Sequence, residues 1–127
     1  TDAIFDLVNA DFITYETGGT LTADGTEQNV YINNAPAGIF KPLTVIIDLD
    51  AMAAGDSTYI KLYYRIKSGG GLQLFDVTTY VGADGGLAGG RKLISIGLLP
   101  NRFGLKVTLQ QTAGANKNYD YETIFDQ

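Results

Sequence analysis

Apolar and polar residues alternate strictly between positions 57 and 67. A period of two is typical of a β-strand with one buried and one exposed face. The expected buried face carries Thr58, Ile60, Leu62, Tyr64 and Ile66, and the expected exposed face carries Tyr59, Lys61, Tyr63, Arg65 and Lys67. Glycines 69–71 then allow a tight reversal, because glycine tolerates positive φ. Residues 72–81 are again rich in β-branched and aromatic side chains. The pattern predicts a long central β-hairpin.

Comparable short segments recur along the chain, separated by Gly, Pro, Asn and Asp. We expect strands within 3–17, 28–32, 43–50, 91–98, 103–110 and 118–125, and a flexible exposed loop over the glycine-rich residues 82–90. The expected inner faces are Leu43, Val45, Ile47 and Leu49; Phe103, Leu105, Val107 and Leu109; and Tyr119, Tyr121, Thr123 and Phe125. Eight or nine short strands without a long helix predict an all-β fold, an antiparallel β-sandwich of jelly-roll or immunoglobulin-like type.

The N-terminal segment is the sharpest feature outside this pattern. Ile4, Phe5, Leu7 and Val8 form an apolar, strand-like stretch, and Gly18-Gly19 follows as a candidate boundary. We therefore divide the chain into an arm, 1–17, and a sandwich domain, 18–127. The arm either pairs within its own sandwich or fills a sheet edge of a neighbouring copy as a donor strand. Burial of the four apolar side chains would contribute on the order of 6–10 kcal/mol before costs. Head-to-tail exchange would build a filament.

Composition narrows the function. The 127 residues suit one domain, and 14 acidic against 9 basic residues give a net charge of −5. An acidic chain whose few cations cluster only at 61–67 and 91–92 is a poor nucleic-acid binder. No apolar run is long enough for a membrane helix, so we expect no membrane insertion. Because the chain begins at Thr1, we expect a mature form from which a leader was removed.

Candidate chemistry is sparse. Cysteine and histidine are absent, which removes disulfides, thiol chemistry and the commonest general base. Asp48 and Asp50, with Asp56 nearby, would supply only part of a calcium site, because calcium needs six to eight oxygen ligands. Glycosidase carboxylates need a cleft, which positions so close together on one exposed face do not suggest. Asp24-Gly25 and Asp84-Gly85-Gly86 indicate turns, because no phosphate-loop lysine or helix follows. We predict no enzyme activity, no cofactor and no bound metal.

Tyr59 and Tyr63, with Lys61 and Arg65, form an aromatic and basic stripe on the expected outer face. Tyrosine offers a flat apolar ring with a polar tip, which suits stacking on sugars or burial at an interface. The alternative is cross-strand pairing on an outer sheet face without any ligand. Glycans are therefore candidate partners.

Three segments carry a resemblance: Ile47–Asp56, Tyr59–Lys67 and Phe103–Gly114 with the aromatic tail that follows. They resemble small β-sandwich proteins of phage and archaeal-virus type over residues 43–126. This resemblance implies a jelly-roll-like structural subunit and no site residues. In architecture the chain is also similar to extracellular fibre subunits that polymerise by donating an N-terminal strand.

These observations favour a structural subunit of an extracellular filament or fibre. Copies of the chain would be its partners, and its N-terminal arm would dock on a neighbour. The alternatives are a decoration or capsid-associated subunit at a virion surface, and a carbohydrate-binding module.

Overall fold

The computed structural model describes residues 14–34 and 41–126. They form β1 (Thr14–Thr22), β2 (Gln28–Asn33), β3 (Lys41–Asp48), β4 (Ser57–Tyr64), β5 (Gln73–Val81), a 3₁₀ turn η1 (Ala83–Gly86), β6 (Leu93–Gly97), β7 (Leu105–Ala113) and β8 (Asn118–Asp126). Within these ranges no helix is long and apolar enough to cross a membrane.

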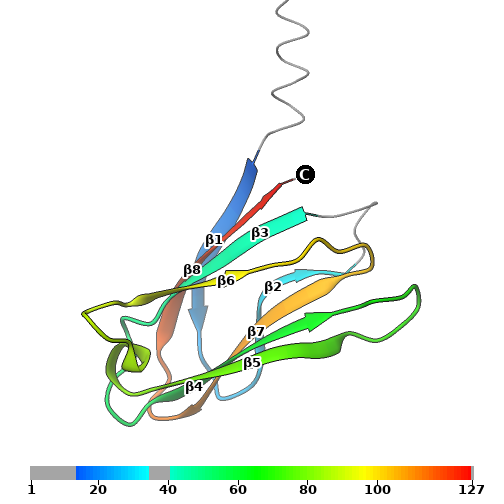
Figure 1. Cartoon of the computed structure of the whole chain (residues 1–127). Coiled ribbons are helices and arrows are strands. Elements are labelled where there is room, and N and C mark those ends of the chain that lie inside the picture. The colour runs from blue at the N-terminus through cyan, green and yellow to red at the C-terminus, as the bar shows by residue number, and fades with distance from the viewer. Residues whose placement is uncertain (1–13, 35–40, 127) are drawn as a thin grey trace, which may run out of the picture.

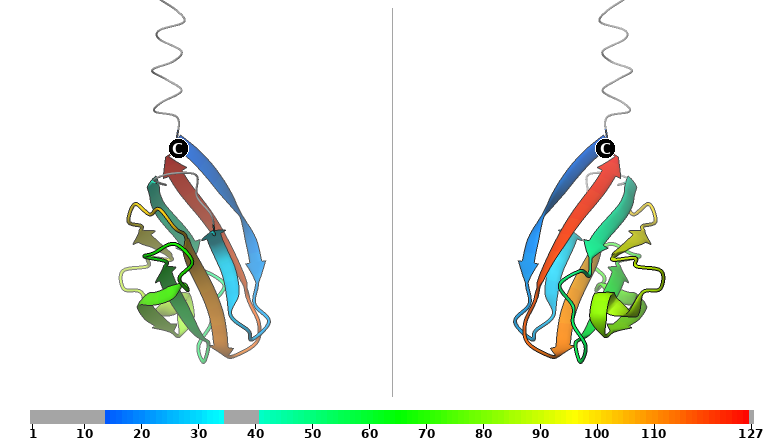
Figure 2. Two further views of the ribbon diagram at one scale, coloured as in Figure 1. Left: turned by 90° about the vertical axis from the view of Figure 1, so that its right-hand side faces the viewer. Right: turned by 90° about the vertical axis from the view of Figure 1, so that its left-hand side faces the viewer.

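The strands build two four-stranded antiparallel sheets (Figures 1 and 2). Sheet A has the order β1-β8-β3-β6, and sheet B has the order β2-β7-β4-β5. Successive strands alternate between the sheets, except β4 and β5, which are the two arms of one hairpin. This is the strand order of a jelly roll, built from two Greek keys. The predicted antiparallel β-sandwich is confirmed, and of the two predicted forms the chain adopts the jelly roll.

The core lies between the inner faces of the sheets, where the sequence alternation placed it. The side chains of Val45, Ile47, Leu49, Leu105, Val107, Leu109 and Tyr119 are fully buried. Thr58, Ile60, Leu62 and Tyr64 of β4 are buried as well. Because every second residue of a strand points to the same face, a short alternating segment was enough to identify these positions.

Ile66 is an exception, and its predicted burial is wrong. β4 ends at Tyr64, and the backbone N–H of Arg65 donates to the carbonyl of Gly104 at 2.9 Å as the chain turns into the hairpin loop. Ile66 is consequently 79% exposed. The predicted exposure of the 82–90 loop is also wrong at Gly85, which is buried in η1. A Cβ there would lie 2.4 Å from Leu49 Cδ1.

Gly18 and Gly19 lie inside β1 and pair with Glu122 and Tyr121 of β8. A Cβ on Gly18 would lie 2.5 Å from the Tyr121 carbonyl oxygen, so glycine permits the close approach of these strands. Residues 14–17 pair with β8 in the same chain, and the predicted arm, 1–17, therefore overlaps β1 by these residues. Ile4, Phe5, Leu7 and Val8 lie outside the described residues, so their role stays a prediction.

A buried hydrogen-bond network closes the end of the sandwich where β4 begins. The Tyr119 hydroxyl donates to Gln111 Oε1 at 3.0 Å and accepts from the Thr58 hydroxyl at 2.7 Å. The Gln111 amide nitrogen donates to the carbonyls of Ala113 and Ala115. Burial raises the pKa of Tyr119, which keeps its hydroxyl neutral. Satisfied buried polar groups of this kind fix one packing arrangement and explain why this end is closed.

Candidate assembly groove between the β5 and β6 edges

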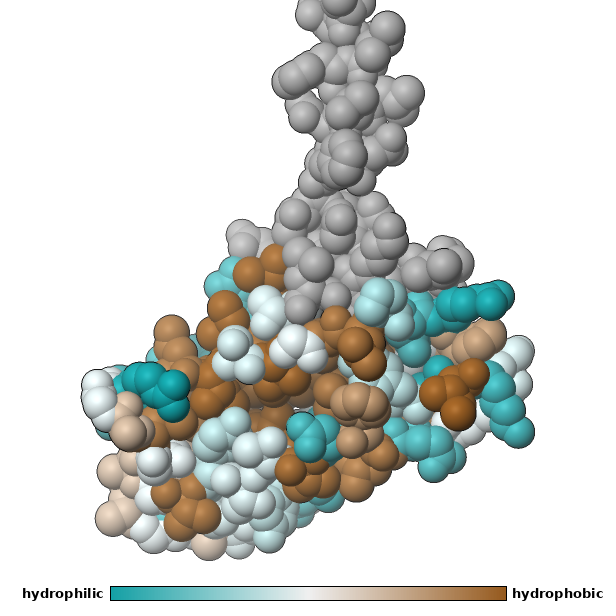
Figure 3. All heavy atoms as spheres, in the orientation of Figure 1, coloured by the Kyte–Doolittle hydropathy of each residue, from teal (hydrophilic) through white to brown (hydrophobic). Residues whose placement is uncertain are grey.

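β5 and β6 are edge strands of different sheets that lie on the same side of the sandwich (Figure 1). In the described part of the chain β5 pairs only with β4, and β6 pairs only with β3. Each therefore retains a row of backbone N–H and C=O groups without a strand partner. In the same orientation, apolar surface gathers in a band along this side (Figure 3). The sandwich is open here.

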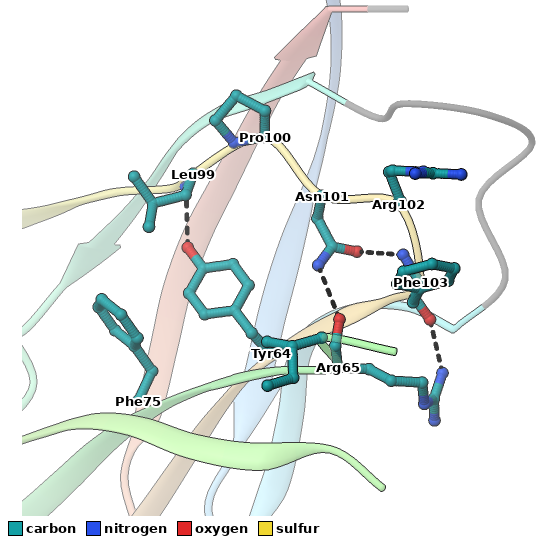
Figure 4. Close-up of a pocket in the computed structure, with 9 residues that line it drawn as sticks. Tyr64, Arg65, Phe75, Leu99, Pro100, Asn101, Arg102 and Phe103 are labelled. Carbon is teal, nitrogen blue, oxygen red and sulfur yellow. Dashed lines mark hydrogen bonds between the residues drawn. The ribbon is translucent and has the colours of Figure 1, made fainter. Parts of the chain in front are cut away.

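An open pocket of about 320 Å³ lies at one end of this side (Figure 4). We call it the β5–β6 groove; its lining residues are Tyr64, Arg65, Ile66, Phe75, Leu99, Pro100, Asn101, Arg102 and Phe103. Phe75 is 60% exposed and Leu99 is 52% exposed. The Phe75 ring meets the Tyr64 ring edge-on, with the centroids 5.0 Å apart. Large side chains of this kind, clustered and uncovered, mark an interaction surface.

Hydrogen bonds hold the wall of the groove in place. The Tyr64 hydroxyl accepts from the backbone N–H of Leu99 at 2.8 Å. Asn101, which is 8% exposed, donates from its amide to the carbonyl of Arg65 at 3.3 Å and accepts from the backbone N–H of Phe103 at 3.0 Å. It also accepts from the N–H of Gly104. The loop after β6 is thus fastened to the end of β4, so the groove is a preformed feature of the fold.

Positive charge collects beside the groove. The Arg65 guanidinium donates to the carbonyls of Gly70, Asn34 and Phe103 at 2.7–2.8 Å, so it ties three segments together through neutral acceptors. Arg65 and the exposed Arg102 line an adjacent hollow of about 390 Å³ at the hairpin tip. Carbonyl oxygens leave the guanidinium charge in place, so this end of the groove favours an anionic group.

A separate small cavity of about 20 Å³ lies between β4, β5 and β6, lined by Ile60, Leu62, Asp76, Thr78, Tyr80 and Ile96. Asp76 pairs with Leu62, and Thr78 pairs with Ile60, so both point to the inner side of β5. Both are exposed. The inner side of β5 is therefore polar and exposed at these two positions, whereas Tyr80 on the same side packs against the core.

The structure places Tyr59 and Tyr63 on the outer face of sheet B, away from the groove. The Tyr63 hydroxyl donates to Glu27, and the Lys106 ammonium lies 4.5 Å from the centroid of its ring. Burial, together with the bond to Glu27, raises the pKa of Tyr63. One ring face and the hydroxyl are thus already engaged within the chain, which supports cross-strand pairing. Glycan binding by Tyr59 and Tyr63 stays a prediction.

The Asp48, Asp50 and Asp56 carboxylates are spread among separate partners. Asp48 accepts from the backbone N–H of Asp50 at 2.8 Å, and Asp50 pairs with Lys92 at 3.0 Å. Asp56 is buried and accepts from the N–H of Ala53 at 2.9 Å. Among residues 14–34 and 41–126, no three acidic side chains come together as metal ligands. The calcium hypothesis gains no support from this arrangement.

Sequence reasoning missed the groove, because its residues come from three separate segments. Tyr64–Ile66, Phe75 and Leu99–Phe103 become neighbours only through the jelly-roll connections. Local alternation even assigned Ile66 to the core. One available signal was the apolar cluster Leu98-Leu99 followed by Pro100-Asn101, which is unusual for an exposed loop.

The fold resembles that of a subunit from Bacillus endospore appendages, which form a novel family of disulfide-linked pili. The two chains are 17% identical with a TM-score of 0.53, and the match covers 91% of this chain and 88% of that one. A chain of infectious bursal disease virus strain Gx is 11% identical with a TM-score of 0.44, over 91% of this chain and 33% of that one. No protein-family model matches the sequence, and no curated protein matches it. The predicted resemblance to fibre subunits is confirmed at the level of the fold.

Proposed function

We propose that the protein is a structural subunit of an extracellular filament or fibre. Copies join when the N-terminal arm of one copy occupies the β5–β6 groove of the next. The observation that carries this proposal is the uncovered apolar groove formed by the end of β4, Phe75 of β5 and the loop after β6, beside two sheet edges that have free backbone groups. A segment bound there gains hydrogen bonds from an edge strand and buries its apolar side chains, as in β-strand addition.

The arm and the groove are chemically complementary. The arm supplies Ile4, Phe5, Leu7 and Val8, and the groove offers Phe75, Leu99 and their neighbours. Residues 1–13 also contain Asp2, Asp6 and Asp11 but no lysine or arginine. The cationic end of the groove, with Arg65 and Arg102, suits such an acidic segment.

The positions of arm and groove favour an open chain of copies. The arm continues from β1, the edge of sheet A opposite to β6. Donor and acceptor surfaces on opposite edges make a heterologous contact, which propagates into a filament when it does not close into a ring. Thirteen residues at about 3.3 Å each reach about 43 Å, enough to extend to a neighbouring copy.

The likeness to the pilus subunit supports a polymer, with one chemical difference. Those pili are disulfide-linked, whereas this chain contains no cysteine. Linkage between copies of this chain therefore rests on noncovalent burial and strand pairing.

The test disables donor and acceptor separately. A donor variant, Phe5→Asp with Leu7→Asp, places charges in the apolar stretch of the arm. An acceptor variant, Phe75→Asp with Leu99→Asp, places them in the groove. Neither should form filaments in electron micrographs, because burial of a charge in an apolar site is costly. A 1:1 mixture should give a discrete heterodimer, since one intact arm meets one intact groove.

Ile32→Asp is the matched control. Ile32 is 42% exposed and lies on β2, the edge of sheet B opposite to β5, and this variant should still form filaments. Filaments from the donor variant would refute arm docking. A fixed oligomer of the unmodified chain in light scattering would instead favour the virion-subunit alternative.

A further inference from the structure

The two outer faces of the sandwich carry opposite charge. On the strands of sheet A, the charged side chains that the structure describes are Asp48, Asp120 and Glu122. Glu122 pairs with Ile46, and Ile46 alternates with the fully buried Val45 and Ile47, so these carboxylates stand on the outer side. Asp120 accepts from the Thr20 hydroxyl at 2.6 Å, a bond that leaves its negative charge in place. This face is anionic.

The outer face of sheet B is cationic. Lys61 and Lys106 point outward from β4 and β7, and Tyr63, which pairs with Lys106, lies between them. Glu27 approaches Lys61 at 3.9 Å and offsets one of the two charges. Asp76, the charged residue of β5, points to the inner side instead. The described charges on this face therefore sum to a positive value.

Each face also exposes apolar side chains beside its charges. On sheet A, Ile46 and the exposed Leu93 line a hollow of about 230 Å³ together with the three carboxylates. On sheet B, Val77 pairs with Lys61 and Leu74 pairs with Tyr63, so both stand on the outer side. Leu74 is 53% exposed, and Val77 is 43% exposed. An apolar centre with charges around it is the anatomy of a protein interface.

We propose that the outer face of sheet A of one copy packs on the outer face of sheet B of a second copy. Lys61 and Lys106 then meet the carboxylates around the sheet A hollow, and Leu74 and Val77 cover Ile46 and Leu93. Because the faces lie on opposite sides of the sandwich, the contact is heterologous. It is weak between two single copies and holds only where filaments present many copies side by side, and it uses neither the arm nor the groove.

The strength of this contact should depend on the salt concentration. Each copy carries a net charge of −5, so two copies repel each other at long range in any other orientation. At about 0.1 M salt the Debye length is about 10 Å, which screens distant charges more than charges in contact. At about 1 M it is about 3 Å, and contacting pairs are weakened as well. Side-by-side association should therefore be present at about 0.1 M and lost at about 1 M.

The experiment reverses each face in the full chain. One variant carries Lys61→Glu and Lys106→Glu, and the other carries Asp120→Lys and Glu122→Lys. Low-speed pelleting collects bundles, high-speed pelleting collects single filaments, and the supernatant retains monomers. Each variant alone should lose bundling at least about tenfold, because like charges then face each other. A mixture of the two should bundle again, since each anionic face now finds a cationic face on the other variant.

Lys67→Glu with Arg91→Glu, at exposed loop positions outside both faces, changes the net charge as much as the lysine reversal, and bundling should persist. If the lysine-reversed variant misfolds by circular dichroism, Lys61→Gln with Lys106→Gln replaces it, with an expected loss of about two- to fivefold. In preparations that give a high-speed pellet, absence of low-speed pelleting at about 0.1 M, bundling by either reversed variant alone, or failure of the mixture overturns the proposal. Failure of arm docking is distinct, because the high-speed pellet is then missing or is still formed by the variant with Phe5→Asp and Leu7→Asp.

Discussion

β4 and β5 are two arms of one hairpin, yet the apolar side chains of β4 lie on the inner face of the sheet and most of those of β5 lie on the outer face. In β4 the inner residues Ile60 and Leu62 are apolar and buried, and the outer residues Tyr59, Lys61 and Tyr63 are half-buried and polar or aromatic. In β5 the inner residues Asp76 and Thr78 are polar and exposed, and the outer residues Leu74, Val77 and Val81 are apolar and exposed. Both strands alternate, apart from a bulge at Phe75 of β5, so the pattern alone does not reveal which side faces the core.

The difference arises from what covers each strand. β4 lies between β7 and β5, and its inner side packs into the core between the sheets. β5 is an edge strand at the open side, where the inner space contracts to a cavity of about 20 Å³. An inward-pointing charge on an edge strand discourages uncontrolled edge-to-edge pairing. The apolar residues of β5 are then left for contacts with other copies.

The largest expected effect is a difference in stability between matched substitutions in β4 and β5. Leu62→Ala removes a side chain that is 6% exposed, and we expect the free energy of unfolding to fall by about 2–5 kcal/mol. Leu74→Ala, the same substitution on the outer side of β5, should change it by less than about 0.5 kcal/mol. Urea denaturation of the dilute protein, followed by circular dichroism, measures both. Equal losses would mean that the outer side of β5 is covered within a single copy.

A smaller effect concerns the polar outer side of β4. Partial burial acts to raise the pKa of Glu27, but hydrogen bonds from Tyr63 and Thr108 and the charges of Lys61 and Lys106 outweigh it and lower the pKa. A lowered pKa stabilises the fold above the ordinary glutamate value of about 4.3, and this stabilisation is lost as the pH falls through the folded value.

Glu27→Gln should remove this loss of stability at acidic pH. At neutral pH the substitution should lower the free energy of unfolding by about 0.2–1 kcal/mol, the range of exposed ion pairs. The measurement is the free energy of unfolding of both proteins from pH 7 down to pH 3. If the two curves fall in parallel below the ordinary glutamate value, Glu27 does not hold the outer side of β4 through its charge.

The central strands were predictable because their burial follows from local alternation. Val45, Ile47, Leu105, Val107 and Leu109 are all fully buried, as the sequence indicated. Alternation gave no sign of where β4 ends, because Ile66 continues the pattern beyond Tyr64. The end is set by contacts of Arg65 with Gly104 and Phe103, which lie far away in sequence.

The edges were not predictable for a related reason. Gly18-Gly19 has the composition of a hinge, yet it is needed where β1 approaches the Tyr121 carbonyl. The β5–β6 groove depends on the order of strands in two sheets, and no local pattern encodes that order. The hairpin sequence identified β5 as a strand but did not indicate that it lies at an open edge.

The smallest expected change in stability tests the protective role of the inner side of β5. Asp76→Val replaces the inward charge with an apolar residue, so that no charged side chain remains on this edge strand. Because Asp76 is exposed, the free energy of unfolding should change by less than about 0.5 kcal/mol. Association should nevertheless increase, since an apolar edge with free backbone groups is a template for irregular pairing. Light scattering over time measures this, and Thr79→Val, which adds the same side chain on the outer side of β5 without removing a charge, is the control. Similar scattering by both variants would show that the β5 edge is protected by other means than the Asp76 charge.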